Sequence, residues 1–215
     1  MTKIKFCGLR RPVDAAHAAT LGAAYGGVIL TESKRQVTLA EACAVFDAAP
    51  SLRRVGVVGY ESVSRLLAMA KKADLHVLQL HGNFDPDDLT QLRQEFDGEL
   101  WTVIPVESSG AISVDWRDIA DSADAILLDT NVGSRTGGTG RVFDWKAARP
   151  LVNEIALEIP VIVAGGLTPQ NVASAIAELH PAVVDVSSGV ESAPGVKSHE
   201  LMTAFAQAVV SASIV

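Results

Sequence analysis

Two side chains suited to proton transfer stand at the ends of short apolar runs in this chain. Cys7 ends the run at residues 3–7, and Asp129 follows the run at residues 125–128. A thiol, whose ordinary pKa is about 8.5, is readily tuned into a general base near neutrality. A carboxyl group that is partly desolvated at the floor of a pocket has a raised pKa and suits a general acid. Cys7 is therefore a candidate base and Asp129 a candidate acid.

Both residues also have a plain structural interpretation. Cys7 could be a small buried hydrophobe, as a lone cysteine on a strand often is, and Asp129 could be a solvated loop carboxylate or the cap of a turn. Cys43 lies inside an Ala-rich helical stretch and is expected to be structural. The position of Cys7 and Asp129 at strand ends favours chemistry for these two.

Further polar or glycine-rich positions follow other apolar runs. Arg35 is either a surface charge or a guanidinium fork that holds a carboxylate. His81 is either a packed imidazole or a polar wall of the site. Gly165–Gly166 and Ser187-Ser188-Gly189 let backbone N–H groups approach an anion closely, so phosphate is the expected ligand. A tight turn is the alternative for any single glycine.

The segment at residues 131–140, directly after Asp129 and Thr130, is long and rich in glycine. Its composition suits a lid that closes over a ligand, and a plain flexible loop is the alternative.

Eight short apolar runs must position these residues. They recur at a spacing of roughly 20–35 residues, with Ala- and charge-rich helical stretches between them. Most are continuously apolar, which is typical of parallel strands buried on both faces. The runs span residues 3–7, 27–30, 55–58, 77–80, 100–104, 125–128, 161–164 and 183–186.

This organisation predicts an α/β protein with a single closed (β/α)8 barrel, or TIM barrel, over residues 1–215. A flavodoxin-like or Rossmann sheet would use five or six units and leave about 50 residues unexplained. In a barrel, the carboxyl ends of the strands and the loops after them form the reaction chamber, and loops seven and eight are the usual phosphate site.

Several helix boundaries can be predicted from local signals. Thr38 and Glu41 form a capping-box pattern, and Asp85-Pro86 and Thr168-Pro169 each place a capping side chain before a proline at the first helical position. Gly22 and Gly98 are expected to end the first and fourth helices.

Composition restricts the kind of partner. The chain has 215 residues, of which 48% are hydrophobic and 20% charged, and its net charge is −7 with Lys and Arg scattered. These values exclude disorder and argue against nucleic-acid binding as the function, because such binding needs clustered positive charge. No apolar run approaches the roughly 20 residues that span a bilayer. Small molecules are the expected partners.

Cysteine and histidine usage add further expectations. Two cysteines are too few for a disulfide framework, and no apolar leader is evident, so a reducing cytoplasm is the expected location. The histidines do not combine with carboxylates in a recognisable ligand spacing, so no metal is expected.

Taken together, the motifs of this chain resemble those of the phosphoribosylanthranilate isomerase family, almost from end to end. The order and placement of the motifs carry the resemblance, since any one glycine-rich loop is common among barrel enzymes. They are KFCGL at 5–9, SKR at 33–35, QLHG at 79–82, LLDT at 127–130, GGTGRVFDW at 137–145, AGGLTPQNV at 164–172, DVSSGVE at 185–191 and PGVK at 194–197.

The resemblance implies an Amadori rearrangement without a cofactor, in which N-(5-phosphoribosyl)anthranilate becomes 1-(2-carboxyphenylamino)-1-deoxyribulose 5-phosphate. By this match Asp129 is the acid, Cys7 is the base and Arg35 holds the anthranilate carboxylate. Gly166, Ser188 and Gly189 would hold the phosphate, and His81 and Asp185 would line the substrate site, with Asp185 orienting the sugar. The protein would act as a monomer or homodimer.

Two other functions stay open from the residues alone. A triose-phosphate-type isomerase would share the carboxylate after strand six and the histidine after strand four, but it would need a lysine at the mouth of strand one and a longer glutamate as base. A catalytically silent phosphosugar-binding barrel is the second alternative, against which the presence of both Cys7 and Asp129 argues.

Overall fold

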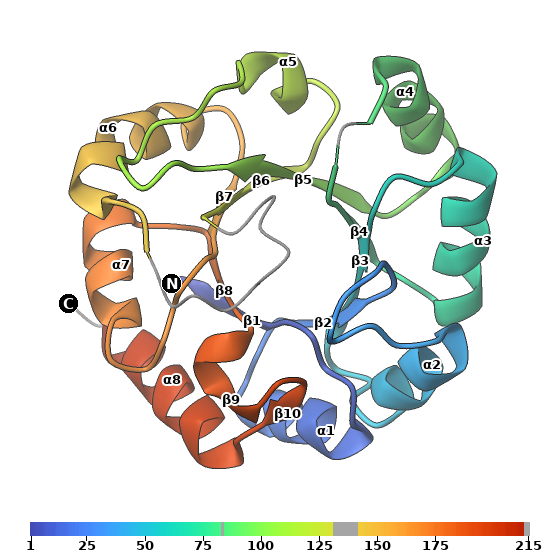
Figure 1. Cartoon of the computed structure of the whole chain (residues 1–215), viewed down its shortest axis with the longest axis horizontal. Coiled ribbons are helices and arrows are strands. Elements are labelled where there is room, and N and C mark those ends of the chain that lie inside the picture. The colour runs from blue at the N-terminus through green and yellow to red at the C-terminus, as the bar shows by residue number, and fades with distance from the viewer. Residues whose placement is uncertain (83, 131–141, 213–215) are drawn as a thin grey trace.

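The computed structural model describes residues 1–82, 84–130 and 142–212. Within these residues eight parallel strands, β1 to β8, close into a barrel in sequence order, and the helices surround it (Figure 1). The predicted (β/α)8 barrel is confirmed. All eight predicted strands are present, and their bounds differ from the prediction by at most two residues at either end.

The strands are β1 (Lys3–Phe6), β2 (Tyr25–Ile29), β3 (Arg53–Val58), β4 (Val77–Leu80), β5 (Glu99–Pro105), β6 (Ala125–Asp129), β7 (Val161–Val163) and β8 (Val183–Val186). The helices are α1 (Pro12–Thr20), α2 (Leu39–Asp47), α3 (Val63–Ala73), α4 (Pro86–Glu95), α5 (Arg117–Ala120), α6 (Trp145–Ile155), α7 (Val172–Leu179) and α8 (His199–Ala212).

The barrel closes where β1 pairs with β8, and in this register Lys5 stands opposite Asp185. Side chains alternate along each strand, so the odd and even positions face opposite sides of the barrel wall. Ile4 and Phe6 face outward, into the large core between the strands and the helices. Lys5 and Cys7 therefore face inward.

A second and smaller apolar cluster fills the inside of the barrel at its amino-terminal end. Tyr25 and Trp101 are its largest members, with ring centroids 4.8 Å apart in an edge-to-face arrangement. Its other buried members are Val55, Val77, Val103, Ala125, Leu127, Ile162, Ala164 and Val183. This layer fills one end of the barrel, which leaves the carboxyl ends of the strands as the place for a ligand site, as in other barrels of this kind.

Most of the predicted helix boundaries are confirmed. Thr38 caps α2 in a complete capping box with Glu41, and Asp85 caps α4 ahead of Pro86. Gly22 follows the end of α1 with a φ of +73°, the left-handed conformation that a helix-terminating glycine adopts.

Two boundary predictions are wrong. Helix α7 begins at Val172 rather than after Thr168, because residues 168–171 form a turn in which Asn171 Oδ1 accepts a hydrogen bond from Thr168 N at 2.8 Å. Helix α4 ends at Glu95, and Gly98 does not have a positive φ. Gly98 is instead required by close packing, since a Cβ there would lie 2.3 Å from Phe96 Cζ and 2.7 Å from His76 O.

The chain between β8 and α8 contains elements that the sequence pattern did not predict. A 3-10 helix (Ser188–Val190) leads into an antiparallel hairpin of β9 (Glu191–Ala193) and β10 (Val196–Lys197). Figure 1 shows this hairpin at the rim of the barrel, beside α1, and Arg11 Nη2 donates a hydrogen bond to Lys197 O at 3.0 Å. Among the described helices, none is long and apolar enough to span a membrane.

The capping box of α2 gives a test of the fold that leaves the barrel interior untouched. Replacing Thr38 with Ala removes the acceptor of the Glu41 N–H, which should lower the free energy of unfolding by about 1 kcal/mol. Urea denaturation measures this change. Ser174→Ala, at an exposed position inside α7, is the matched control and should change stability by less than about 0.5 kcal/mol. Equal stability of the two variants would contradict the capping role.

Candidate active site

A cavity of about 390 Å³ opens at the carboxyl ends of the strands. It is lined by every residue that the sequence singled out for a site, and these come from six different segments of the chain. They are Cys7, Arg35, His81, Asp129, Gly166, Asp185, Ser188 and Gly189. The structure thus brings together residues that are up to 182 positions apart in the sequence, as from Cys7 to Gly189.

The inward-facing residues near the carboxyl ends of the strands bring polar groups into the cavity, although the strands themselves are mostly apolar. On β4, Val77 belongs to the inner apolar cluster, Gln79 is the next inward residue, and His81 follows beyond the end of the strand. On β8 the inward row runs through Val183 and Asp185 to Ser187 in the same way. β4 and β8 therefore each contribute an apolar side chain to the plug and polar side chains to the chamber.

Cys7 lies beside a buried ion pair. Lys5 is fully buried, and its Nζ lies 2.9 Å from Asp185 Oδ2. Gly27, on the neighbouring strand, leaves the space for this cluster, since a Cβ there would lie 3.2 Å from both Cys7 Sγ and Lys5 Nζ. Burial raises the pKa of the Cys7 thiol, and the nearby Lys5 ammonium offsets part of this rise. The pKa of Lys5 itself is raised, because Asp185 and Cys7 outweigh the effect of burial.

Asp185 lines the cavity and has one carboxylate oxygen without a hydrogen-bond donor among the described residues. Its Oδ2 is paired with Lys5, while its Oδ1 is buried and accepts no hydrogen bond from the described residues. A buried carboxylate oxygen without a donor is costly, and a ligand hydroxyl would satisfy it.

Asp129 ends β6 and faces the same cavity. The loop after β7 passes close to it, because Gly165 has a φ of +82° and a Cβ at this position would lie 2.8 Å from Asp129 Oδ1. Glycine is therefore required at position 165 both for backbone conformation and for the approach to this carboxylate.

His81 is a neutral wall of the cavity. Its pKa is lowered to about 4, mainly by burial and further by the charge of Lys5. His81 Nε2 lies 2.8 Å from Gln79 Nε2, an amide nitrogen that can only donate, so this ring nitrogen acts as the acceptor. Near neutral pH His81 is therefore a hydrogen-bonding group and not a source of positive charge.

Backbone N–H groups gather at the loops after β7 and β8. Gly166 has a φ of +68°, and Asn171 Nδ2 donates to its carbonyl at 3.0 Å, which fixes the turn. No described residue accepts a hydrogen bond from the N–H of Gly166 or of Ser188. Gly189 packs directly against the loop after β7, since a Cβ there would lie 1.8 Å from Leu167 O. Such N–H groups, held on two adjoining loops, suit the binding of an anion.

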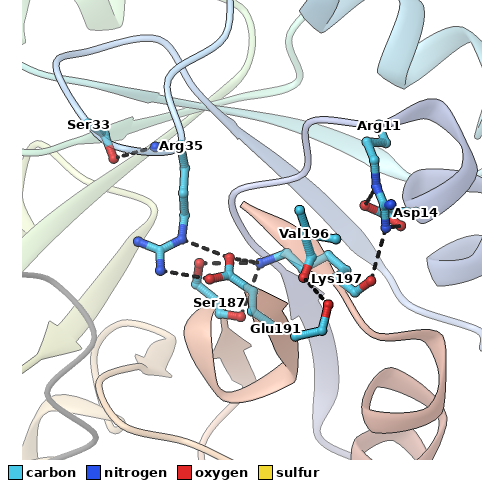
Figure 2. Close-up of polar contacts among 9 residues, drawn as sticks. Arg11, Asp14, Ser33, Arg35, Ser187, Glu191, Val196 and Lys197 are labelled. Atoms are coloured by element: carbon cyan, nitrogen blue, oxygen red, sulfur yellow. Dashed lines mark hydrogen bonds and ion pairs between the residues drawn. The ribbon is translucent and has the colours of Figure 1, made fainter. Parts of the chain in front are cut away.

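Arg35 contacts a carboxylate of the protein itself. Its Nε and Nη2 donate to Glu191 Oε1 and Oε2, each at 2.8 Å (Figure 2). Lys197 Nζ reaches the same Oε1 at 2.9 Å and also donates to Ser187 O at 3.0 Å. The hydrogen bond to Glu191 raises the pKa of Arg35. Burial raises the pKa of Glu191, but Arg35 and Lys197 outweigh it, and the net shift is downward.

Sequence reasoning did not assign roles to Lys5, Gln79, Glu191 and Lys197. For Lys5 a signal existed, because a lysine two residues before Cys7 must share its inward face. Glu191 and Lys197 fall within the quoted motifs, but only the hairpin brings them to Arg35.

The proposed lid at residues 131–140 lies outside the described residues. Among the residues described, no group of three or more His, Cys, Asp or Glu side chains could hold a metal ion.

Comparisons with known proteins identify relatives of the whole chain. The family model for N-(5'-phosphoribosyl)anthranilate isomerase matches residues 4–208. An N-(5'-phosphoribosyl)anthranilate isomerase of Haloferax volcanii is 40% identical over 216 residues, which cover 99% of this chain and 95% of the relative.

Solved structures agree with this result. The crystal structure of phosphoribosyl anthranilate isomerase from Thermus thermophilus has a TM-score of 0.83 and 34% identity, covering 98% of this chain and 99% of that one. A phosphoribosyl anthranilate isomerase in complex with reduced 1-(o-carboxyphenylamino)-1-deoxyribulose 5-phosphate has a TM-score of 0.80 and 28% identity, covering 98% and 100%.

The contact of Gly189 with Leu167 O allows a test of the anion-binding loops. In Gly189→Ala the added methyl group must push the two loops apart, so the affinity for inorganic phosphate, measured by titration calorimetry, should fall at least about tenfold. Gly22→Ala is the control, because its Cβ meets nothing within 4 Å and only its φ of +73° is strained. It should lose stability and bind phosphate normally. Unchanged phosphate binding by folded Gly189→Ala would contradict the assignment.

Proposed function

The chain belongs to the phosphoribosylanthranilate isomerase family, and we propose that Asp129 is the general acid and Cys7 the general base of its reaction. It is an isomerase of tryptophan biosynthesis, and the proposed reaction converts N-(5'-phosphoribosyl)anthranilate to 1-(2-carboxyphenylamino)-1-deoxyribulose 5-phosphate. The observation that carries the proposal is that Cys7 and Asp129 line one cavity together with the anion-binding loops.

The first step opens the furanose ring. Asp129 donates its proton to the ring oxygen as the bond from that oxygen to C1 breaks, and the lone pair of the anthranilate nitrogen forms a C1=N double bond. The product is a Schiff base with a positive charge on nitrogen. Protonation of the leaving oxygen by a positioned acid contributes roughly 10²–10⁴-fold to a rate.

The second step removes the proton on C2. The Cys7 thiolate takes it, the electron pair of the C–H bond forms a C1=C2 double bond, and the electrons of the C1=N bond return to nitrogen. The resulting enolamine tautomerises to the ketone. Atoms and electrons balance within the substrate, so the conversion needs no added oxidant or reductant.

Lys5 supports the base. Since burial disfavours the thiolate, an adjacent cation is needed to bring Cys7 to its anionic form. Lys5 supplies this charge from inside the barrel, and its pairing with Asp185 fixes its position.

The remaining site residues hold the substrate in this proposal. Gly166, Ser188 and Gly189 bind the phosphate through backbone N–H groups, and the unpaired Oδ1 of Asp185 accepts a hydrogen bond from a sugar hydroxyl. Arg35 binds the anthranilate carboxylate, and neutral His81 forms a polar wall. A cytoplasmic location and a monomeric or homodimeric state stay predictions.

Removal of either proton-transfer group tests the mechanism. Asp129→Asn and Cys7→Ala should each lower kcat at least about 100-fold while leaving the fold intact, because each step then lacks its positioned acid or base. The assay follows the loss of anthranilate fluorescence as freshly generated phosphoribosylanthranilate is consumed, with circular dichroism as the check on folding.

Cys43→Ala is the matched control, since Cys43 lies on α2 outside the cavity and should retain wild-type turnover. Near-wild-type kcat in either site variant would overturn the proposed acid–base pair. Tight binding of the phosphosugar by the wild type without turnover would instead favour the silent-binding alternative.

The role of Lys5 predicts a pH effect with a definite sign. If the thiolate is the active form, kcat rises with pH through the pKa of Cys7. Lys5→Met removes the cation that lowers this pKa, so the rising limb should move to higher pH. A Cys43→Ala background allows the Cys7 thiolate to be titrated directly by its ultraviolet absorbance. A rising limb at unchanged or lower pH would contradict this role.

A further inference from the structure

The guanidinium group of Arg35 is bound on one edge only. A guanidinium has five N–H donors, and Glu191 takes one from Nε and one from Nη2. Figure 2 shows Nη1 directed away from Glu191, and no described residue accepts a hydrogen bond from it. Arg35 also lines the cavity. The edge formed by Nη1 and the second N–H of Nη2 is thus a complete two-pronged donor for another carboxylate.

Glu191 accepts a hydrogen bond from Lys197, and all three N–H donors of this lysine have acceptors within the protein. The Lys197 side chain has no exposed surface, and that of Glu191 is 5% exposed. Lys197 Nζ contacts Glu191 Oε1 at 2.9 Å, Ser187 O at 3.0 Å and Ser187 Oγ at 3.4 Å. These three acceptors match the three donors of an ammonium group. Burial lowers the pKa of Lys197, and the adjacent Glu191 carboxylate opposes this change.

The same contacts reach the phosphate-binding loop. Ser187 directly precedes Ser188 and Gly189, so Lys197 ties the carboxylate partner of Arg35 to the start of that loop. Gly8 permits this arrangement over the end of β1. Its φ is +68°, and a Cβ there would lie 2.8 Å from Arg35 Cδ and 3.0 Å from Ser187 Oγ.

We propose that Glu191 and Lys197 are positioning residues that aim the free edge of Arg35 into the cavity and fix its distance from the phosphate loop. The proposal rests on the proposed function, in which the substrate carries a carboxylate at one end and a phosphate at the other. A rigid link between the two anion sites selects ligands whose anionic groups have the matching separation.

Glu191 could affect the affinity for a substrate carboxylate in either of two opposite directions, and this makes the proposal testable. The negative charge of Glu191 repels a substrate carboxylate, so its removal would strengthen binding if Glu191 only competed for Arg35. If Glu191 positions Arg35, its removal weakens binding, because Arg35 must then be ordered by the ligand itself.

The experiment compares two ligands by calorimetry. One is reduced 1-(o-carboxyphenylamino)-1-deoxyribulose 5-phosphate, and the other is its analogue with a phenyl group in place of the carboxyphenyl group. The ratio of their dissociation constants isolates the contribution of the carboxylate, and inorganic phosphate serves as the probe of the other end.

In Glu191→Gln the preference for the carboxylated ligand should fall about tenfold, and the affinity for inorganic phosphate should fall less than about twofold. In steady-state kinetics KM should rise while kcat changes little. Glu178→Gln, which breaks the exposed pair with Arg149 on the outside of the barrel, is the control and should keep the full preference.

A second variant covers the case in which Glu191→Gln fails to fold with an unpaired buried lysine. The double variant Glu191→Gln/Lys197→Met removes both charges and should lose the same preference. An unchanged or increased preference in either folded variant overturns the proposal. Measurements on the wild type and on Arg35→Ala distinguish a failure of the Arg35 assignment from a failure of the positioning role of Glu191 and Lys197. If the wild type shows no preference for the carboxylated ligand, or if Arg35→Ala keeps that preference, the assignment of Arg35 fails.

Discussion

The closure of the barrel between β1 and β8 is the constraint on which the site depends. Its register sets Lys5 opposite Asp185 and leaves their ion pair buried inside the wall. Removing two charges from water is expensive, and such a pair is tolerated only where the geometry is good. A slip of β1 by one residue would turn Lys5 and Cys7 toward the outer helices and would leave Asp185 inside the barrel without its cation. The pair therefore favours a single register, and that register places Cys7 in the cavity.

The inward-facing side chains divide the interior of the barrel into an apolar plug at its amino-terminal end and a chamber that carries polar groups at its carboxyl-terminal end. Trp101 and Tyr25 fill the amino-terminal end of the barrel interior. Within the chamber, burial shifts the pKa of each ionisable group in the direction that disfavours its charged form. It disfavours the thiolate of Cys7 and the protonated form of His81. Proton transfer in such a place requires fixed charges nearby, and Lys5 provides one.

The sequence predicted those structural features that depend on patterns among neighbouring residues. The eight strands, the capping box at Thr38 and the cap at Asp85 follow from hydrophobic runs and from residues close in the chain. The later start of α7 was not predictable from Thr168-Pro169, because a side chain three residues further on, Asn171, takes the hydrogen bond that fixes the turn. The Arg35–Glu191 pair joins residues 156 positions apart and exists only through the hairpin after β8. Long-range pairing of this kind has no local signature.

The balance of charge around Cys7 gives a physical reason for the proposed phosphate site to consist of backbone groups. Three cations, Lys5, Arg35 and Lys197, stand against two carboxylates, Asp185 and Glu191, so these five groups sum to one positive charge. A phosphate carries about −1.5 to −2 charges at neutral pH. Additional lysines or arginines at Gly166 and Ser188 would bind it more strongly but would also stabilise the thiolate of Cys7, and a more stable thiolate is a weaker base. In the proposed binding mode, backbone N–H dipoles would hold the phosphate while adding no net charge, so both ends of the substrate could be bound without weakening the proposed base between them.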